Sequence, residues 1–188
     1  MLTFDDFKTG YRLLIMLHRK KDGGHGRADY HSIKYLVNGK EEFDEKLKRL
    51  QDAKATHSDI PYRIYSSINE RDMDKAIRKF KYEIIDNDYV DKIQRNRFYT
   101  DINNRLIGCV QKPENKKTKN FLFDVDEGTH YKTDKDVELF CQHLLFYTNI
   151  LFKKKTKNGW HIITEPFNVS ELDYKIGDLL KDALLFIE

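Results

Sequence analysis

An apolar segment that ends in acids and a glycine lies past the middle of the chain and reads Phe121-Leu122-Phe123-Asp124-Val125-Asp126-Glu127-Gly128. Its aromatic and β-branched residues predict a strand, and the glycine predicts the turn that ends the strand. Because side chains of a strand alternate between its two faces, Asp124 and Asp126 should share one face while Val125 points to the other. We therefore expect a core strand that presents two carboxylates near its end.

The residues after this strand predict a capped helix and then a hairpin. Thr133, with Asp136 three residues further on, is a typical helix cap. Apolar residues follow at helical spacing: Val137, Phe140, Cys141, Leu144 and Leu145. Residues 150–152 and 160–164 have the composition of strands, and Asn158-Gly159 between them is a hairpin signal.

The rest of the chain carries helix and strand patterns without a regular βαβ rhythm. Helices are expected over residues 3–21, 41–55, 69–84 and 170–182, with Asn69 as the cap of the third, and strands over residues 62–68 and 183–187. This order predicts an α+β fold with a mixed or antiparallel central sheet flanked by helices. No linker or internal repeat interrupts residues 1–188, so we expect a single domain whose first part, residues 1–60, is helical.

The composition fits a folded protein of a reducing compartment. Its 39% hydrophobic and 13% aromatic residues are enough to build a core although 35% of the residues are charged, and the net charge of +3 is only mildly basic. Cys109 and Cys141 lie far apart among apolar neighbours and predict buried free thiols. No run approaches the roughly 20 apolar residues that span a bilayer, and the acidic start does not fit a signal peptide. We expect a cytoplasmic protein with no membrane partner, in the cytoplasm of the host if the source is viral.

The two carboxylates suggest a metal site. Like charges on one strand face repel each other, and a divalent cation removes that repulsion. Mg²⁺ and Mn²⁺ prefer oxygen ligands, and Mg²⁺ typically takes one or two carboxylates together with substrate phosphates. Asp124 and Asp126 are therefore candidate ligands for Mg²⁺ or Mn²⁺. The alternative is a strand end with solvated acids before a turn, because Asp-x-Asp alone is a weak pattern.

A second candidate cluster lies in the hairpin, at Lys157-Asn158-Gly159-Trp160-His161. Lysine offers a mobile positive charge to phosphate, glycine lets phosphate approach the backbone, and histidine can donate a hydrogen bond to it. Lys157, Gly159 and His161 are therefore candidate contacts for the phosphates of a nucleotide. The alternative for a lone histidine in a strand is a hydrogen-bonded packing residue.

These two clusters, in this order and separated by one helix, resemble the motifs of the archaeo-eukaryotic primase superfamily. Its primase-polymerase members are common in phages, plasmids and mobile elements. Residues 122–126 match the first motif and residues 157–161 the second, while residues 65–71 resemble the strand-to-helix junction of some members. The resemblance covers about residues 61–188, which would form the catalytic core, and does not extend to residues 1–60.

The resemblance implies a metal-dependent nucleotidyltransferase, a DNA primase or polymerase that uses nucleoside triphosphates. Its partners would be single-stranded or primed nucleic acid, with a helicase or another replication protein as a further partner. In the family, the acids of the first motif bind two divalent ions and the histidine contacts the phosphates of the incoming nucleotide. Asp124 and Asp126 would accordingly be catalytic metal ligands, and Lys157 and His161 phosphate contacts.

The third family motif, an apolar residue followed by an acid, has five candidates after the histidine: Glu165, Asp173, Asp178, Asp182 and Glu188. Asp182 precedes the last apolar run and is the assignment made from sequence, although Lys181 stands at the apolar position. If the third acid has been lost, the chain would be a non-catalytic nucleotide- or nucleic-acid-binding module. A metal-dependent nuclease that uses the same carboxylates is the other alternative.

A basic and aromatic segment supplies candidate contacts for nucleic acid. Arg95 and Arg97 precede Phe98 and Tyr99, and Arg105 follows. Arginines can pair with phosphates while aromatic rings stack on bases. A helix whose arginines surround an aromatic core stripe explains the same pattern equally well.

Overall fold

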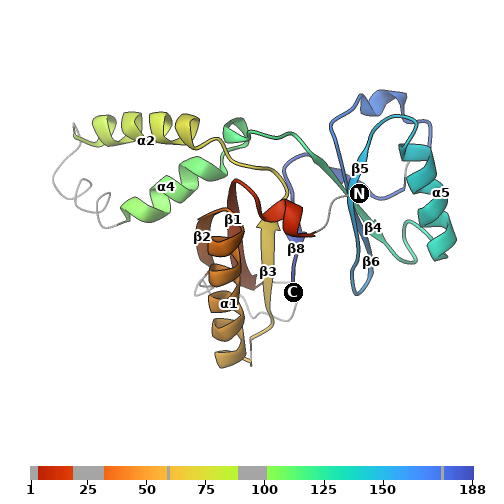
Figure 1. Cartoon of the computed structure of the whole chain (residues 1–188), viewed down its shortest axis with the longest axis horizontal. Helices are drawn as coiled ribbons and strands as arrows, with labels where there is room; N and C mark the ends of the chain where they lie inside the picture. Colours follow the sequence, from red (N-terminus) through yellow and green to blue (C-terminus); the bar gives the residue numbers. More distant parts are fainter. Residues whose placement is uncertain (1–3, 19–31, 59, 89–100, 175) are drawn as a thin grey trace.

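The computed structural model describes residues 4–18, 32–58, 60–88, 101–174 and 176–188. Within these residues the chain is an α+β protein with four α-helices and two four-stranded antiparallel sheets (Figure 1). The α+β class is thus confirmed, whereas the prediction of one central sheet is wrong. None of the described helices is both long enough and apolar enough to cross a membrane.

The first sheet has the strand order β2-β1-β3-β8. Its strands are β1 (Tyr11–His18), β2 (Ile33–Asn38), β3 (Tyr62–Ser67) and β8 (Leu184–Phe186). The prediction of a helix over residues 3–21 is wrong, because a short 3₁₀-helix, η1 (Phe4–Lys8), leads directly into β1. Five consecutive residues of β1 are buried, and such a continuous apolar run does not distinguish a central strand from a buried helix. Among the described residues of 1–60, the prediction of a helical segment therefore holds for α1 (Lys40–Thr56) and not for β1 and β2.

Helices cover both faces of the first sheet. On one face α1 buries Phe43 and Leu50 in a cluster with Leu14 of β1. On the other face α2 (Met73–Asp88) and α4 (Ile102–Gln111) bury Ala76 and Val110 against the sheet. Asn69 does not cap α2 as predicted, because the helix begins four residues later. The carboxylate of Asp72 instead accepts a hydrogen bond from the backbone N–H of Lys75, at 3.0 Å.

The second sheet has the order β5-β6-β4-β7 and carries the segment from which the fold was predicted. Its strands are β4 (Phe121–Asp126), β5 (Ile150–Lys155), β6 (Gly159–Thr164) and β7 (Asp178–Leu180). One face packs on α5 (Asp134–Leu144), where Phe123 and Val125 are fully buried with Phe140. The predicted cap of α5 is confirmed as a capping box formed by Thr133 and Asp136.

The prediction of a helix over residues 170–182 is wrong. This segment contains a short 3₁₀-helix, η4 (Val169–Glu171), and then β7. Leu172, Ile176 and Leu179 all pack on the α5 cluster, and their spacing imitates that of a helix. Gly177, at φ 86°, has a backbone conformation that a helix does not contain.

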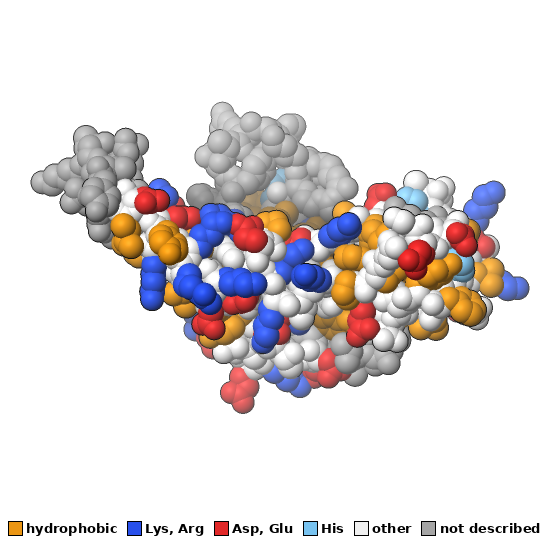
Figure 2. Space-filling view, turned by 90° about the horizontal axis from the view of Figure 1, so that it is seen from above, with side chains coloured by type: hydrophobic (Ala, Val, Ile, Leu, Met, Phe, Trp, Pro, Cys, Tyr) orange, Lys and Arg blue, Asp and Glu red, His pale blue; other side chains and the backbone are white. Residues whose placement is uncertain are grey.

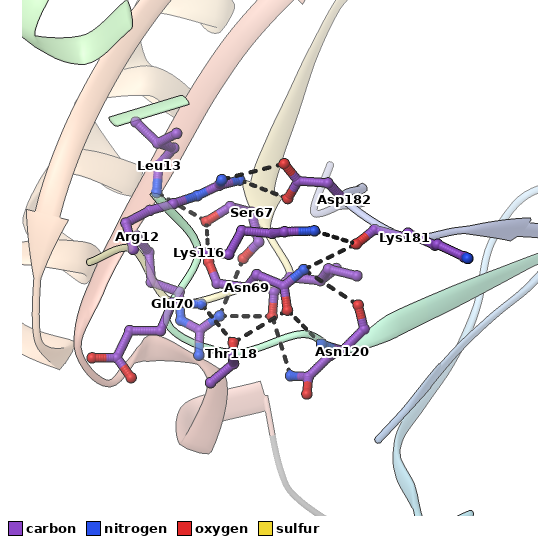
Figure 3. Close-up of polar contacts among 12 residues, drawn as sticks. Arg12, Leu13, Ser67, Asn69, Glu70, Lys116, Thr118, Asn120, Lys181 and Asp182 are labelled. Carbon is purple, nitrogen blue, oxygen red and sulfur yellow. Dashed lines mark hydrogen bonds and ion pairs between the residues drawn. The ribbon is translucent and has the colours of Figure 1, made fainter. Parts of the chain in front are cut away.

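Polar side chains join the two sheets where three backbone segments cross between them (Figure 3). The side-chain amide of Asn69 donates to the carbonyl oxygens of Asn120 and Lys181, at 3.2 and 3.4 Å, and its oxygen accepts from the Asn120 N–H at 2.6 Å. Arg12 is buried and donates to the carbonyl oxygens of Ser67 and Ile68. We call this group of contacts the sheet junction. It fixes how the two sheets meet, and hence the shape of the space between them.

Candidate functional site

A pocket of about 620 Å³ lies between the two sheets. The second sheet contributes Leu122, Asp124, Asp126, His161 and Leu180. The first sheet contributes Arg63, Tyr65, Leu184 and Phe186, and the hairpin between β5 and β6 contributes Thr156, Lys157 and Asn158. Residues of both sequence motifs therefore line one cavity. The residues of the first sheet form a further wall of this cavity, which neither motif predicted.

The two aspartates of β4 share the pocket face of the second sheet, as the strand pattern predicted. Asp124 and Asp126 line the pocket, while Phe123 and Val125 are buried on the α5 side. The Asp124 side chain retains 41% of its exposure, and Asp126 is exposed. Water, cations and phosphates can therefore reach both carboxylates.

His161 lies directly beside Asp124 because the two residues are paired across β4 and β6. The Nε2 atom of His161 is 3.3 Å from Oδ1 of Asp124. His161 is only 8% exposed, and its Nδ1 atom has no hydrogen-bond partner among the described residues. The histidine is thus held against the carboxylate at the pocket wall, where it can donate to Asp124 or to a ligand oxygen.

Asp178 is the acid that sequence reasoning did not assign. It starts β7 and is paired with Asp124, on the side of β4 opposite to His161. Directly opposed residues of neighbouring strands point to the same face, so Asp178 lies on the same face of the sheet as Asp124, although it is not among the residues that line the pocket. The signal is an acid before two leucines, Asp178-Leu179-Leu180, but the helical spacing of the surrounding residues hides it.

Asp182 does not lie with these carboxylates. Its carboxylate forms two hydrogen bonds with the guanidinium of Arg71, at 3.0 and 3.3 Å. The register explains the separation: Leu180 is opposite Leu122, so Asp182 lies beyond the first residues of β4, away from the end that holds Asp126. The structure therefore gives Asp182 an ion-pair partner at the sheet junction and does not bring it to Asp124.

The hairpin turn is displaced by one residue from the predicted Asn158-Gly159. The backbone N–H of Thr156 donates to the carbonyl of Gly159 at 2.8 Å, so Lys157 and Asn158 form the tip. Lys157 can therefore line the same pocket as His161. Gly159 is buried and is not among the pocket-lining residues, and its lack of a side chain lets it lie against the backbone of β4, where a Cβ atom would meet the carbonyl oxygen of Val125.

The lysines before the hairpin belong to β5 and not to a loop. Lys154, paired with His161, donates from Nζ to the carbonyl oxygens of Phe186 and Ile187, at 3.1 and 2.9 Å. Burial lowers the pKa of Lys154. Lys153 points to the other face, with its ammonium 4.3 Å from the centre of the Trp160 ring. Lys154 thus ties the second sheet to β8 beside the pocket.

The other basic residues give less support for a nucleic-acid surface. Arg95 and Arg97 lie outside the described residues. Figure 2 shows Lys and Arg side chains gathered over α2 and the segment that leads to β4, with acidic side chains among them. Several of these lysines have acidic partners: Lys75 with Asp72, Lys79 with Glu114, Lys112 with Glu83 and Lys117 with Glu70. Such ion pairs reduce the positive potential available to a phosphate backbone.

The donor set at the pocket suits a hard divalent cation that shares its coordination with a substrate. Two carboxylates on one wall, with access to solvent, are the protein contribution typical of Mg²⁺ sites that also use phosphates and water. In the described part of the chain, no group of three or more His, Cys, Asp or Glu side chains is arranged to hold a metal ion. Comparison of the chain with protein-family models, with curated proteins and with solved structures gave no significant match.

Proposed function

We propose that the pocket between the two sheets binds a nucleoside triphosphate and that the chain is a metal-dependent nucleotidyltransferase of the primase-polymerase type. The observation that carries this proposal is the meeting of Asp124, Asp126, Lys157 and His161 in one cavity. These residues come from two motifs about thirty residues apart in the sequence. The cavity volume of about 620 Å³ lies within the range of roughly 300–1,000 Å³ that is typical of small-molecule sites.

Each of these four residues has a distinct part in the proposed reaction. Asp124 and Asp126 would hold Mg²⁺ or Mn²⁺, and the bound ions would stabilise the attacking 3′ oxygen and the leaving pyrophosphate. Lys157 at the hairpin tip would attract the triphosphate. His161, next to Asp124, would donate a hydrogen bond to a phosphate oxygen once the nucleotide has entered.

The third acidic position of the motif set is assigned to Asp178 in place of Asp182. Asp178 is exposed and stands opposite Asp124 on the pocket face, whereas the carboxylate of Asp182 is engaged by Arg71. The described residues hold no group of three acids arranged around a metal ion, so the Asp178 side chain would have to turn towards Asp124 to ligate an ion that Asp124 and Asp126 bind from one strand. This assignment keeps all three acids on neighbouring strands of one sheet.

The proposal is tested by nucleotide incorporation. The full chain is incubated with Mn²⁺, a primed single-stranded template and labelled nucleoside triphosphates, both ribo and deoxyribo. The double variant Asp124→Asn/Asp126→Asn should lose incorporation but keep its fold, because both residues are at least partly exposed. Asp173→Asn, an exposed acid outside the pocket lining, is the matched control and should retain activity. Undiminished incorporation by the double variant would remove the metal assignment.

A second candidate function is supported by one observation. The pocket lining contains two carboxylates, and the described residues provide no complete metal cluster. This favours, as the alternative, a module that binds nucleotide or nucleic acid without turnover. In the same assay such a module would retain labelled triphosphate without extending the primer, and a nuclease would shorten the primer.

A further inference from the structure

The pocket changes from apolar to charged along its length. On β4, the pocket-facing residues follow one another as Leu122, Asp124 and Asp126. Leu180 of β7 is paired with Leu122 and widens the apolar end. At the other end Asp126 is paired with Gly159, the residue that follows the hairpin tip. The second sheet therefore offers an apolar floor next to a polar, hairpin-side end.

The side chains that the first sheet contributes to the pocket also change from apolar to charged along its length. Its pocket-facing side chains succeed one another as Leu184, then the pair Tyr65 and Phe186, then Arg63. Leu184 follows Leu180 by only four residues, so it lies at the apolar end. Arg63 is the member of this wall furthest from Leu184 in the register, which places it towards the charged end.

Tyr65 and Phe186 form an aromatic surface at the middle of this wall. They are directly paired across β3 and β8, and their ring centroids are 5.8 Å apart at an interplanar angle of 65°. The backbone of Phe186 is held by Lys154, which is itself paired with His161. The aromatic pair is thus anchored opposite the row that contains Asp124 and His161. The two rings meet edge to face, so one ring face can stack on a nucleobase, and such stacking accepts any base because every base has a π-face.

From this gradient we infer that the first-sheet wall orients the nucleotide in the pocket. The base lies against Tyr65 and Phe186, with the leucines beneath it, and the triphosphate points to the hairpin, where Arg63 binds it from the side opposite to His161. A guanidinium suits this position because its fork of N–H groups can contact two phosphate oxygens at once. The inference rests on the proposed function for the identity of the ligand as a nucleoside triphosphate.

The test measures binding and incorporation separately. Equilibrium binding to the full chain is measured in Mn²⁺ with three probes: an α,β-methylene deoxynucleoside triphosphate of each base, inorganic triphosphate, and deoxyadenosine. Arg63→Gln should weaken both triphosphate probes about tenfold or more and leave deoxyadenosine unchanged. Phe186→Leu should weaken all four nucleotides and deoxyadenosine by about ten- to hundredfold and leave inorganic triphosphate unchanged.

Two exposed residues outside the pocket serve as matched controls, and a urea titration of each variant verifies folding. Arg78→Gln removes an arginine from α2, and Tyr174→Leu removes an aromatic ring that is 44% exposed. Both should bind all probes as the unaltered chain does. Tyr65→Leu is the second aromatic variant. Because Tyr65 is buried, probe binding by Tyr65→Leu is interpreted only if this variant has the same urea midpoint as the unaltered chain.

The outcomes separate this inference from the proposed function. If the unaltered chain incorporates nucleotides while Arg63→Gln and Phe186→Leu bind every probe normally, the wall does not orient the nucleotide and the proposed function stands. If both wall variants lose their probes as expected but no incorporation occurs, the nucleotide site stands and the transferase proposal fails. If the unaltered chain binds none of the nucleotides, both are overturned.

Discussion

The ion pair between Arg71 and Asp182 allows the role of Asp182 to be measured. The Arg71 side chain is 3% exposed and that of Asp182 is 18% exposed, and two hydrogen bonds join them. Asp182→Ala would leave the guanidinium buried without its carboxylate. Breaking a buried pair from one side costs about 3–5 kcal/mol. Because water can reach the space next to Asp182, we expect the lower limit, about 3 kcal/mol.

A loss of this size is a large part of the free energy of unfolding, which for domains is about 5–15 kcal/mol. For a chain of 188 residues it corresponds to a fall in melting temperature of about 6–12 °C. The double variant Arg71→Met/Asp182→Ala removes both charges and should recover most of the loss, since apolar replacement of a buried pair is often neutral. Unfolding is followed by urea titration with circular dichroism.

The same variants are assayed for nucleotide incorporation at a temperature well below the lowered melting point. Folded Asp182→Ala should incorporate nucleotides as the unaltered chain does, because its carboxylate is not at the pocket. An Asp182→Ala variant that melts at the unaltered temperature but has lost incorporation would contradict the structural role of Asp182. That result would return the third catalytic acid to Asp182, as the sequence alone suggested.

Three further predictions concern the pocket sheet and the thiol of α4. Asp178→Asn should abolish incorporation at unchanged stability, and normal activity would show that Asp178 is no metal ligand. Gly159→Ala should lower the free energy of unfolding by about 1–3 kcal/mol, because the new Cβ would meet the backbone of β4. Gly108→Ala in α4, which meets no atom within 4 Å, should be neutral or stabilising, and equal urea midpoints for the two would disprove the close approach. Burial raises the pKa of Cys109 to about 11, so at pH 8 iodoacetamide should label it at least about a hundredfold more slowly in the folded chain than in urea; comparable rates would contradict its burial.

The parts of the fold that local patterns specify could be predicted from the sequence. β4, with its alternating acids, and α5, with its capping box, are encoded by residues that are neighbours in the chain. β1 and the segment before β7 could not be identified, because an apolar run buried on both sides and three core residues at helical spacing each imitate a helix. Periodicity describes which side chains are buried, and it does not reveal which element buries them.

The residues of the candidate site likewise fall into those that local patterns predict and those whose position depends on the tertiary arrangement. Asp124, Asp126 and His161 were found because each motif is contiguous, and their meeting depends only on the pairing of β4 with β6. Asp178 required the register of β7, which is set by Gly177 and by packing on α5. Arg63 and Tyr65 reach the pocket only because the first sheet stands against the second, and no local pattern in the sequence encodes that arrangement.

The pairing of β3 with β8 has a consequence for the order in which the protein can be made. Tyr65 is paired with Phe186, so one edge of the first sheet is completed by residues that the ribosome adds more than a hundred positions later. At about 5–20 residues per second this interval lasts roughly 6–25 s. During it the backbone groups along that edge of β3 have no strand to pair with, and such an edge can pair with another nascent chain. A chain released before residues 184–186 would keep this edge open, so premature termination should yield aggregates and not a smaller soluble domain.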